Sequence, residues 1–368
     1  MSKLEDILIV GGYGVVGRRI AANLAPDYPD RVVVAGRRLE PAAQLAADLG
    51  RGVQGRRLDI TDAESIEAAL EGVGVVVSCI DQPEPLLLHA AIARGLAYTD
   101  IAPHLMTRRP TEAMHAEAAR SGARLVLGAG LAPGISSMLA RLGADRVGPV
   151  VRVASNLLLS VGDHYGPASR SYILEEIALP YTLVIDGRER PARAFSEPAH
   201  VSFPPPIGPR TAYLFPFSDQ VYFPQTLGAG TAFARLALDP PWLGRLLSAL
   251  VRLGIISAMG RRAGARKRSE RLITRLRSKY RGRDWYSVLV EVQGAGGVFR
   301  GSVTGRGQAD GAATGAAALT RSLAEGEVER PGVWLAEQVV PPGPFFERLA
   351  ACGLVPLVEA PLTLEPPR

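Results

Sequence analysis

The first third of the chain alternates short apolar runs with segments of helical periodicity. The apolar runs have the length and β-branched content of buried strands and lie at 7–10, 31–38, 53–58, 73–79, 97–101 and 123–127. Helical spacing falls between them, at 18–24, 41–49, 63–70, 85–94 and 111–120. Strands separated by helices require right-handed crossovers, so we predict an α/β fold with a doubly wound parallel sheet.

From about residue 150 the pattern becomes mostly extended. Alternation over 151–161, a hairpin around Asp186-Gly187, and a strand pair at 287–293 and 298–305 predict a mixed sheet, with a helix at 171–179. Helical patterns return at 309–323 and 344–352. At 368 residues the chain is long for a single core, so we expect two domains.

The first strand runs directly into a glycine-rich loop. Gly12, Gly14 and Gly17 form G-x-G-x-x-G between a strand and a helix, the context in which this motif predicts a dinucleotide site. We expect Gly12 to permit the turn, Gly14 to admit a pyrophosphate and Gly17 to let the helix pack on the strand. Tyr13, Val15 and Val16 complete the loop at a helix N-terminus, which favours an anion.

The end of the second strand indicates which dinucleotide binds. An NAD-specific chain would carry Asp or Glu here to bind the ribose 2'-hydroxyl. This chain has Gly36-Arg37-Arg38 instead. Gly36 would leave room for a 2'-phosphate, and the two guanidinium groups match phosphate geometry. We therefore predict NADP(H) over NAD(H); the alternative is a pair of solvated arginines.

Other polar residues follow the carboxyl ends of strands, where ligands of such sheets bind. Asp59 and Ile60 would flank the adenine, and Ser78, Cys79 and Ile80 would line the nicotinamide side. Asp100 ends the next strand, and its role is either to cap the following helix or to contact substrate.

Composition places the chain among ordinary globular proteins, with 47% hydrophobic and 21% charged residues. Two cysteines, Cys79 and Cys352, are too few for a disulfide scaffold. No cysteine cluster or histidine pair at helical spacing supports a metal site. The first apolar run ends in the glycine loop, so we expect no secretory signal and a cytoplasmic protein.

The net charge of +6 is concentrated in one segment. Residues 261–283 contain eleven Lys or Arg and a single acid, Glu270. The net positive charge of this segment therefore exceeds that of the whole chain. Before it, Leu243, Leu246, Leu247, Leu250 and Val251 recur at helical spacing. We expect this leucine face to pack inside the protein or in a homodimer. A membrane surface is the alternative; nucleic acid is disfavoured because stacking aromatics and zinc spacing are absent.

Several segments together resemble the saccharopine dehydrogenase-like superfamily. They are the glycine loop, Ala35-Gly36-Arg37, Leu58-Asp59-Ile60, Tyr98-Thr99-Asp100, the stretch from Gly130 to Gly134, Gly332-Val333-Trp334, and the stretch from Phe345 to Leu349 with Gly353. The resemblance implies a Rossmann domain at 1–135, an inserted α+β substrate and dimerisation domain at 136–305, and C-terminal helices at 306–368 that return to the first domain.

The resemblance also implies hydride transfer between NADPH and a small imine or amino-acid substrate. The alternatives are reduction of a carbon-carbon double bond in a lipid or polyketide precursor, and NADP(H) binding without turnover. Position alone selects His164 with Tyr165, and Asp100, as candidate catalytic residues, and Pro133, Gly134 and His104 as candidate substrate-binding residues. His89 and His115 are expected to be ordinary surface residues on helices.

Overall fold

The computed structural model describes residues 5–82, 84–101, 112–163, 173, 176–177, 179–256, 275 and 277–362. The chain forms two compact units. The first contains residues 1–130 and 309–349, and the second contains 131–308 and 350–368. Residues far apart in the sequence therefore share each unit.

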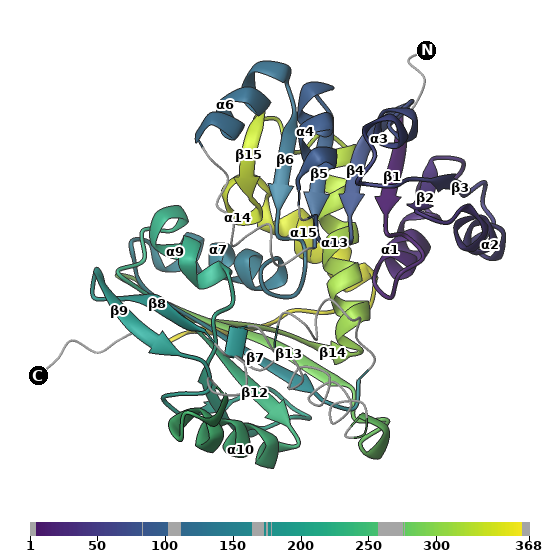
Figure 1. The fold of residues 1–368 in the computed structure, drawn as a ribbon. Helices are drawn as coiled ribbons and strands as arrows, with labels where there is room; N and C mark the ends of the chain where they lie inside the picture. The colour runs from purple at the N-terminus through teal and green to yellow at the C-terminus, as the bar shows by residue number, and fades with distance from the viewer. Residues whose placement is uncertain are drawn as a thin grey trace, which may run out of the picture. The chain divides into compact units, whose positions relative to one another are not determined.

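The first unit is built on a seven-stranded sheet in the order β15-β6-β5-β4-β1-β2-β3 (Figure 1). Every pairing in it is parallel. Its strands are β1 (Asp6–Val10), β2 (Val32–Gly36), β3 (Gln54–Arg57), β4 (Val73–Ser78), β5 (Ala97–Asp100), β6 (Arg124–Leu127) and β15 (Gly332–Leu335). The central strands are buried on both faces, which explains their continuous apolar runs. The predicted doubly wound parallel sheet is confirmed.

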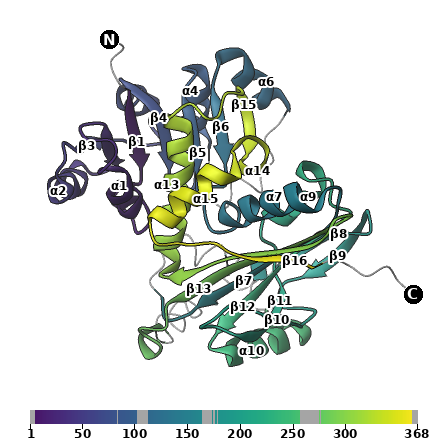
Figure 2. The same ribbon diagram turned by 180° about the vertical axis from the view of Figure 1, so that it is seen from behind.

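Helices connect these strands as the periodicity predicts. They are α1 (Gly17–Leu24), α2 (Leu39–Leu49), α3 (Ala63–Ala69), α4 (Leu86–Ala93) and α6 (Glu112–Ser121), followed late in the chain by α13 (Gln308–Ala324), α14 (Ala336–Val339) and α15 (Pro342–Ala351). Helix α13 crosses one face of the sheet and lies in front of it in Figure 2. Its alanines are buried on nearly every side of the helix. Small side chains let such a helix approach its neighbours closely.

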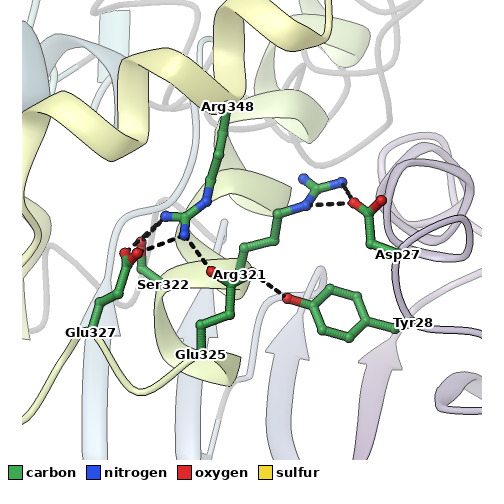
Figure 3. A network of polar contacts seen from close by, with 7 residues as sticks. All are labelled: Asp27, Tyr28, Arg321, Ser322, Glu325, Glu327 and Arg348. Atoms are coloured by element: carbon green, nitrogen blue, oxygen red, sulfur yellow. Dashed lines mark hydrogen bonds and ion pairs between the residues drawn. The ribbon is translucent and has the colours of Figure 1, made fainter.

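A polar network joins α13 and α15 to the end of α1 (Figure 3). The Arg348 guanidinium on α15 donates to Glu327 at 2.7 and 2.8 Å, to Glu325 at 2.6 Å and to the Ser322 hydroxyl at 2.9 Å. The hydrogen bonds from Arg348 lower the pKa of Glu327. Arg321 reaches the other way and donates to the Asp27 carboxylate at 2.6 Å. These charge-assisted bonds attach the C-terminal helices to the first half of the unit.

The second unit has a nine-stranded sheet, and its main path is β10-β11-β12-β7-β13-β14-β16. The strands are β7 (Val150–Ser160), β8 (Pro180–Ile185), β9 (Arg188–Arg193), β10 (Ala199–Ser202), β11 (Pro209–Leu214), β12 (Thr231–Asp239), β13 (Trp285–Gly294), β14 (Gly297–Arg306) and β16 (Leu357–Leu362). Only β7 and β12 pair in parallel. Strands β8 and β9 form the predicted hairpin around Asp186-Gly187. The mixed sheet is confirmed.

Helices cover both faces of this second sheet. Helices α7 (Ile135–Val147) and α9 (Asp219–Thr226) lie on one face and α10 (Pro241–Arg252) on the other, as Figures 1 and 2 both show. Helix α9 was not predicted, because Pro224 and neighbouring aromatics indicated extended chain. Its Gln220 side chain accepts from the backbone N–H of Ala234 at 2.7 Å, so a tertiary contact holds the helix on β12.

The leucine face expected on α10 is only partly buried. The fully buried residues of this helix are Gly244 and Ser248, whereas Leu243, Leu247, Leu250 and Val251 are half-buried and Leu246 is exposed. Leu246 therefore does not pack inside the chain, and its burial in a homodimer, the other part of the expectation, stays a prediction. None of the helices in the described part of the chain is long and apolar enough to cross a membrane.

Candidate dinucleotide site and its acidic neighbour

The glycine loop between β1 and α1 has no space for a side chain at Gly12 or Gly17. A Cβ on Gly12 would lie 2.7 Å from the carbonyl oxygen of Ile9, and a Cβ on Gly17 would lie 2.5 Å from that of Gly11. The left-handed residue of the turn is Gly11, with φ +73°, so Gly12 is required by packing rather than by backbone conformation. Gly14 is exposed, and the Gly11 carbonyl oxygen is the one described atom close to it, 2.9 Å from where a Cβ would lie.

The same loop presents unused donors. Among the described residues, the backbone N–H groups of Tyr13, Val15 and Val16 donate to no acceptor, while the neighbouring N–H of Gly14 donates to the Gly11 carbonyl at 2.9 Å. Free N–H groups at a helix N-terminus, beside an open Gly14, fit a dinucleotide pyrophosphate. An additional cation, Arg18, was not singled out from the sequence; it donates to the Tyr13 carbonyl at 3.1 Å and is exposed.

The end of β2 differs from the prediction in one respect. A Cβ on Gly36 would meet the Tyr13 ring at 2.4 Å, so the space at this glycine is filled by an aromatic ring and is not open. The Tyr13 hydroxyl accepts a hydrogen bond from the backbone N–H of Arg38 at 3.4 Å. Arg37 and Arg38 are both exposed. The end of β2 therefore presents two exposed guanidinium groups and a phenol.

Asp59, at the end of β3, takes part in its own turn. Its carboxylate accepts from the Thr61 N–H at 3.0 Å and the Thr61 hydroxyl at 2.8 Å. These bonds, with smaller contributions from Arg37 and Arg57, lower the pKa of Asp59. Ile60 beside it is half-buried. Asp59 thus orders the entry to α3 and carries a negative charge near Arg37.

Ser78, Cys79 and Ile80 lie beside the glycine loop, as predicted for the carboxyl end of β4. The Cys79 N–H donates to the Val10 carbonyl at 2.9 Å, and a Cβ on Gly11 would meet the Ile80 side chain at 2.6 Å. Burial, with a smaller effect of Asp100, raises the pKa of the Cys79 thiol to about 12. Cys79 is therefore a neutral thiol and not a nucleophile at physiological pH.

Asp100 is the most unusual residue on this edge of the sheet. It pairs in register with Ser78 and is fully buried. One carboxyl oxygen accepts from the Gly128 N–H at 3.1 Å, and the other has no hydrogen-bond partner among the residues described. Burial raises its pKa to about 7, with an added effect of Asp81. The arrowheads of β1, β4 and β5 point the same way in Figure 1, so Asp100 shares an edge with the glycine loop.

A buried amide and phenol accompany Asp100. The Gln82 side-chain amide donates to the Tyr98 hydroxyl at 2.9 Å and to the Ser78 hydroxyl at 3.4 Å. Burial raises the pKa of Tyr98, so the phenol stays neutral. Sequence reasoning gave no role to Gln82 or Tyr98, although Tyr98 stands in the Tyr98-Thr99-Asp100 segment that resembles the family.

The other predicted residues separate into two groups. His104, His164 and Tyr165 lie outside the described residues, so their suggested roles stay predictions. Pro133 and Gly134 belong to the second unit, where Gly134, with φ 120°, precedes α7. In the described part of the chain, no group of His, Cys, Asp and Glu could hold a metal ion.

The expectation that His115 is an ordinary surface residue is wrong. Its Nδ1 accepts from the Val333 N–H at 3.2 Å, and its ring meets Trp334 edge to face at 4.7 Å. It therefore holds α6 against β15, the last strand of the sheet. His89 is exposed on α4, as predicted.

Comparison with known proteins agrees with this geometry. Residues 7–126 match the family described as the saccharopine dehydrogenase NADP binding domain. Apo saccharopine dehydrogenase (L-Glu forming) from Saccharomyces cerevisiae has the same fold over 97% of this chain and 100% of its own length, with a TM-score of 0.68 and 18% identity.

Two other solved structures are similar over smaller parts. Triphenylmethane reductase from Citrobacter sp., complexed with NADP(H), covers 26% of this chain and 38% of its own, with a TM-score of 0.23 and 25% identity. The 3-ketoacyl-(acyl-carrier-protein) reductase from Brucella melitensis, complexed with NADH, covers 33% of this chain and 74% of its own, with a TM-score of 0.28 and 18% identity.

The family match covers the N-terminal part of the first unit, which also contains residues 309–349. Residues 7–126 form an NADP-binding Rossmann domain of the saccharopine dehydrogenase type. The family description names NADP, which agrees with the end of β2, because Gly36-Arg37-Arg38 replaces the acidic residue expected for NAD. The family match supports an NADP-dependent oxidoreductase, and the yeast structure shows that the fold is shared.

Proposed function

We propose that this NADP-binding protein of the saccharopine dehydrogenase type transfers hydride between NADPH and the C=N bond of a small imine of the amino-acid type. The observation that carries the proposal is Asp100, a buried carboxyl group with a pKa of about 7 on the strand edge that also holds the glycine loop. A group with such a pKa exchanges a proton readily near neutral pH.

The chain's residues fit NADP, and each has a separate role in holding it. The free N–H groups of Tyr13, Val15 and Val16 would bind the pyrophosphate, and Arg37 and Arg38 the 2'-phosphate. When bound, NADPH supplies a hydride. Ser78, Cys79 and Ile80 provide a neutral wall beside the glycine loop, consistent with binding an uncharged nicotinamide; these roles are proposals from position.

Reduction of an imine also needs a proton, because the nitrogen must be protonated when hydride adds to the carbon. A protonated Asp100 holds such a proton in a buried environment where water does not compete. The Gly128 N–H would stabilise the ionised carboxylate of Asp100 after the proton leaves. The same hydrogen bond lowers the pKa of Asp100 and so opposes part of the effect of burial. The products of that step are an amine and an ionised Asp100. The yeast structure is named as a saccharopine dehydrogenase, which favours a C=N substrate by analogy of fold.

The test is NADPH oxidation with panels of 2-oxo acids or aldehydes mixed with amino acids, compared with enoyl thioesters. We expect turnover with an imine-forming pair and its loss in Asp100→Asn with NADPH binding intact. Turnover only with enoyl thioesters would transfer the assignment to C=C reduction. NADPH binding with no turnover in either panel would leave a binding protein.

A further inference from the structure

Helix α10 of the second unit packs on its sheet through small residues. A Cβ on Gly244 would lie 2.9 Å from the Tyr213 ring on β11, and Ser248, one turn later, is also buried. Glycine and serine bring the helix close to the sheet but bury little apolar area. The larger side chains of α10 are therefore left to its other faces.

Those faces carry an exposed apolar stripe. Trp242, Leu246, Ala249 and Leu253 follow one another at spacings of four, three and four, so they lie on one side of the helix and its C-terminal turn. All four are exposed: Trp242 by 39%, Leu246 by 44% and Leu253 by 73%, with Ala249 also classed as exposed. A stripe of this kind on the surface of a single chain marks an interaction site.

Cations surround the stripe. Arg245 and Arg252 are exposed on the same helix. The described residues of 275–283 add five more, which are Arg275, Arg277, Lys279, Arg281 and Arg283. This second segment is attached to α10, because the Trp242 indole N–H donates to the Tyr280 hydroxyl at 3.0 Å. No acidic residue lies within 241–256 or in the described part of 275–283; Asp239 and Asp284 border these segments, and Asp239 pairs with Arg283 at 3.8 Å, so Arg283 is partly neutralised.

We propose that α10 and the described residues of 275–283, which are 275 and 277–283, form a surface that binds the face of an anionic phospholipid bilayer. Trp and Leu would enter the boundary between headgroups and acyl chains, while Arg and Lys would contact lipid phosphates, the arrangement of helices that lie in a membrane interface. Each Lys or Arg near such a surface strengthens binding about fivefold.

The charge pattern argues against the two other occupants. A second copy of the chain meeting this surface by two-fold symmetry would set cations against cations, because the bordering acids Asp239 and Asp284 already pair with Arg283 and Arg306 of the same chain. A nucleic acid would satisfy the cations but leave Leu246 and Leu253 without an apolar partner. A bilayer satisfies both parts of the surface.

The test is flotation of the full chain with vesicles of neutral phosphatidylcholine alone or containing about 30% phosphatidylglycerol. We expect recruitment by the anionic vesicles only, and weaker recruitment as salt rises from about 0.1 to about 0.5 M, because salt screens the cations. Arg275→Gln with Arg281→Gln should reduce the partition coefficient about twentyfold or more. Leu246→Gln with Leu253→Gln should reduce it about tenfold.

Matched variants separate this surface from general effects. Arg120→Gln with Arg188→Gln removes the same charge elsewhere, and Leu179→Gln replaces another exposed leucine, so each should float like the wild type. All variants change exposed side chains, and unchanged melting curves would confirm that they fold.

Three results would overturn the proposal. The first is failure of the wild type to float on anionic vesicles at low salt. The second is a dimer in sedimentation that only the leucine variant dissociates, which would assign the stripe to a second copy. The third is binding of single-stranded RNA that depends on Arg275 and Arg281 but not on the leucines.

Discussion

Replacing Asp100 by Asn should stabilise the protein at neutral and alkaline pH. The buried carboxyl group has a pKa of about 7 in the folded chain and an ordinary value of 3.8 when exposed. Asparagine keeps the shape and the oxygen that accepts from the Gly128 N–H at 3.1 Å, but it cannot ionise. The substitution therefore isolates the cost of a buried negative charge.

The sign and size follow from proton linkage. Between about pH 4 and about pH 7 the folded state holds a proton on Asp100 that the unfolded state has released, so the stability of the wild type falls as pH rises. One pKa unit corresponds to about 1.4 kcal/mol, so the whole interval costs about 4 kcal/mol. The two proteins should be equally stable near pH 4, and Asp100→Asn should be more stable by about that amount at pH 8.

The assay is thermal or urea unfolding of both proteins at intervals from about pH 4 to about pH 8. A difference of about 4 kcal/mol corresponds to roughly 8–16 °C in Tm for a unit of this size. Asp59→Asn is a control of opposite sign, because hydrogen bonds lower the pKa of Asp59 and its charge stabilises the folded state above that pKa. Parallel pH profiles for wild type and Asp100→Asn would refute the reasoning, as would destabilisation at pH 8.

Three further predictions concern the cofactor and the fold. Gly36→Ala places a methyl group 2.4 Å from the Tyr13 ring, so the ring must move and NADPH affinity measured by calorimetry should fall about fivefold to tenfold, with NADH less affected. Arg37→Ala should lower NADPH affinity about tenfold to a hundredfold with little change for NADH, and equal binding of both cofactors by the wild type would contradict this. Arg348→Met removes the hydrogen bonds to Ser322, Glu325 and Glu327 and should lower the free energy of unfolding, measured in urea, by about 1.5–3 kcal/mol. The control Arg94→Met loses a more exposed ion pair with Glu67 and should lower it by less than about 1 kcal/mol. An equal cost for the two arginine variants would show that the Arg348 network adds nothing beyond a surface ion pair.

The first unit was largely predictable because its signals are local. Continuous apolar runs mark strands buried on both faces, and helical spacing between them marks the crossovers, so the parallel sheet followed from neighbours in the sequence. The glycine loop was predictable for the same reason, since each glycine answers a steric demand of residues a few positions away. The absence of an acid after β2 also pointed to NADP.

Contacts between distant residues were not predictable. Pro224 indicated extended chain, yet Gln220 and Ala234 hold α9 as a helix. His115 has a helical surface pattern, but it is half-buried and accepts a hydrogen bond from the N–H of Val333, more than two hundred residues later.

The site shows the same division. The sequence by itself determined the dinucleotide loop, the preference for NADP and the position of Asp100 at a strand end, because each depends on residue type and short spacing. Only the tertiary structure decided that Asp100 is fully buried beside Gly128, that Tyr13 fills the space at Gly36, and that α10 packs through Gly244 and leaves its leucines exposed. Burial and close contact depend on which segments meet across the fold, and no short window of sequence contains that information.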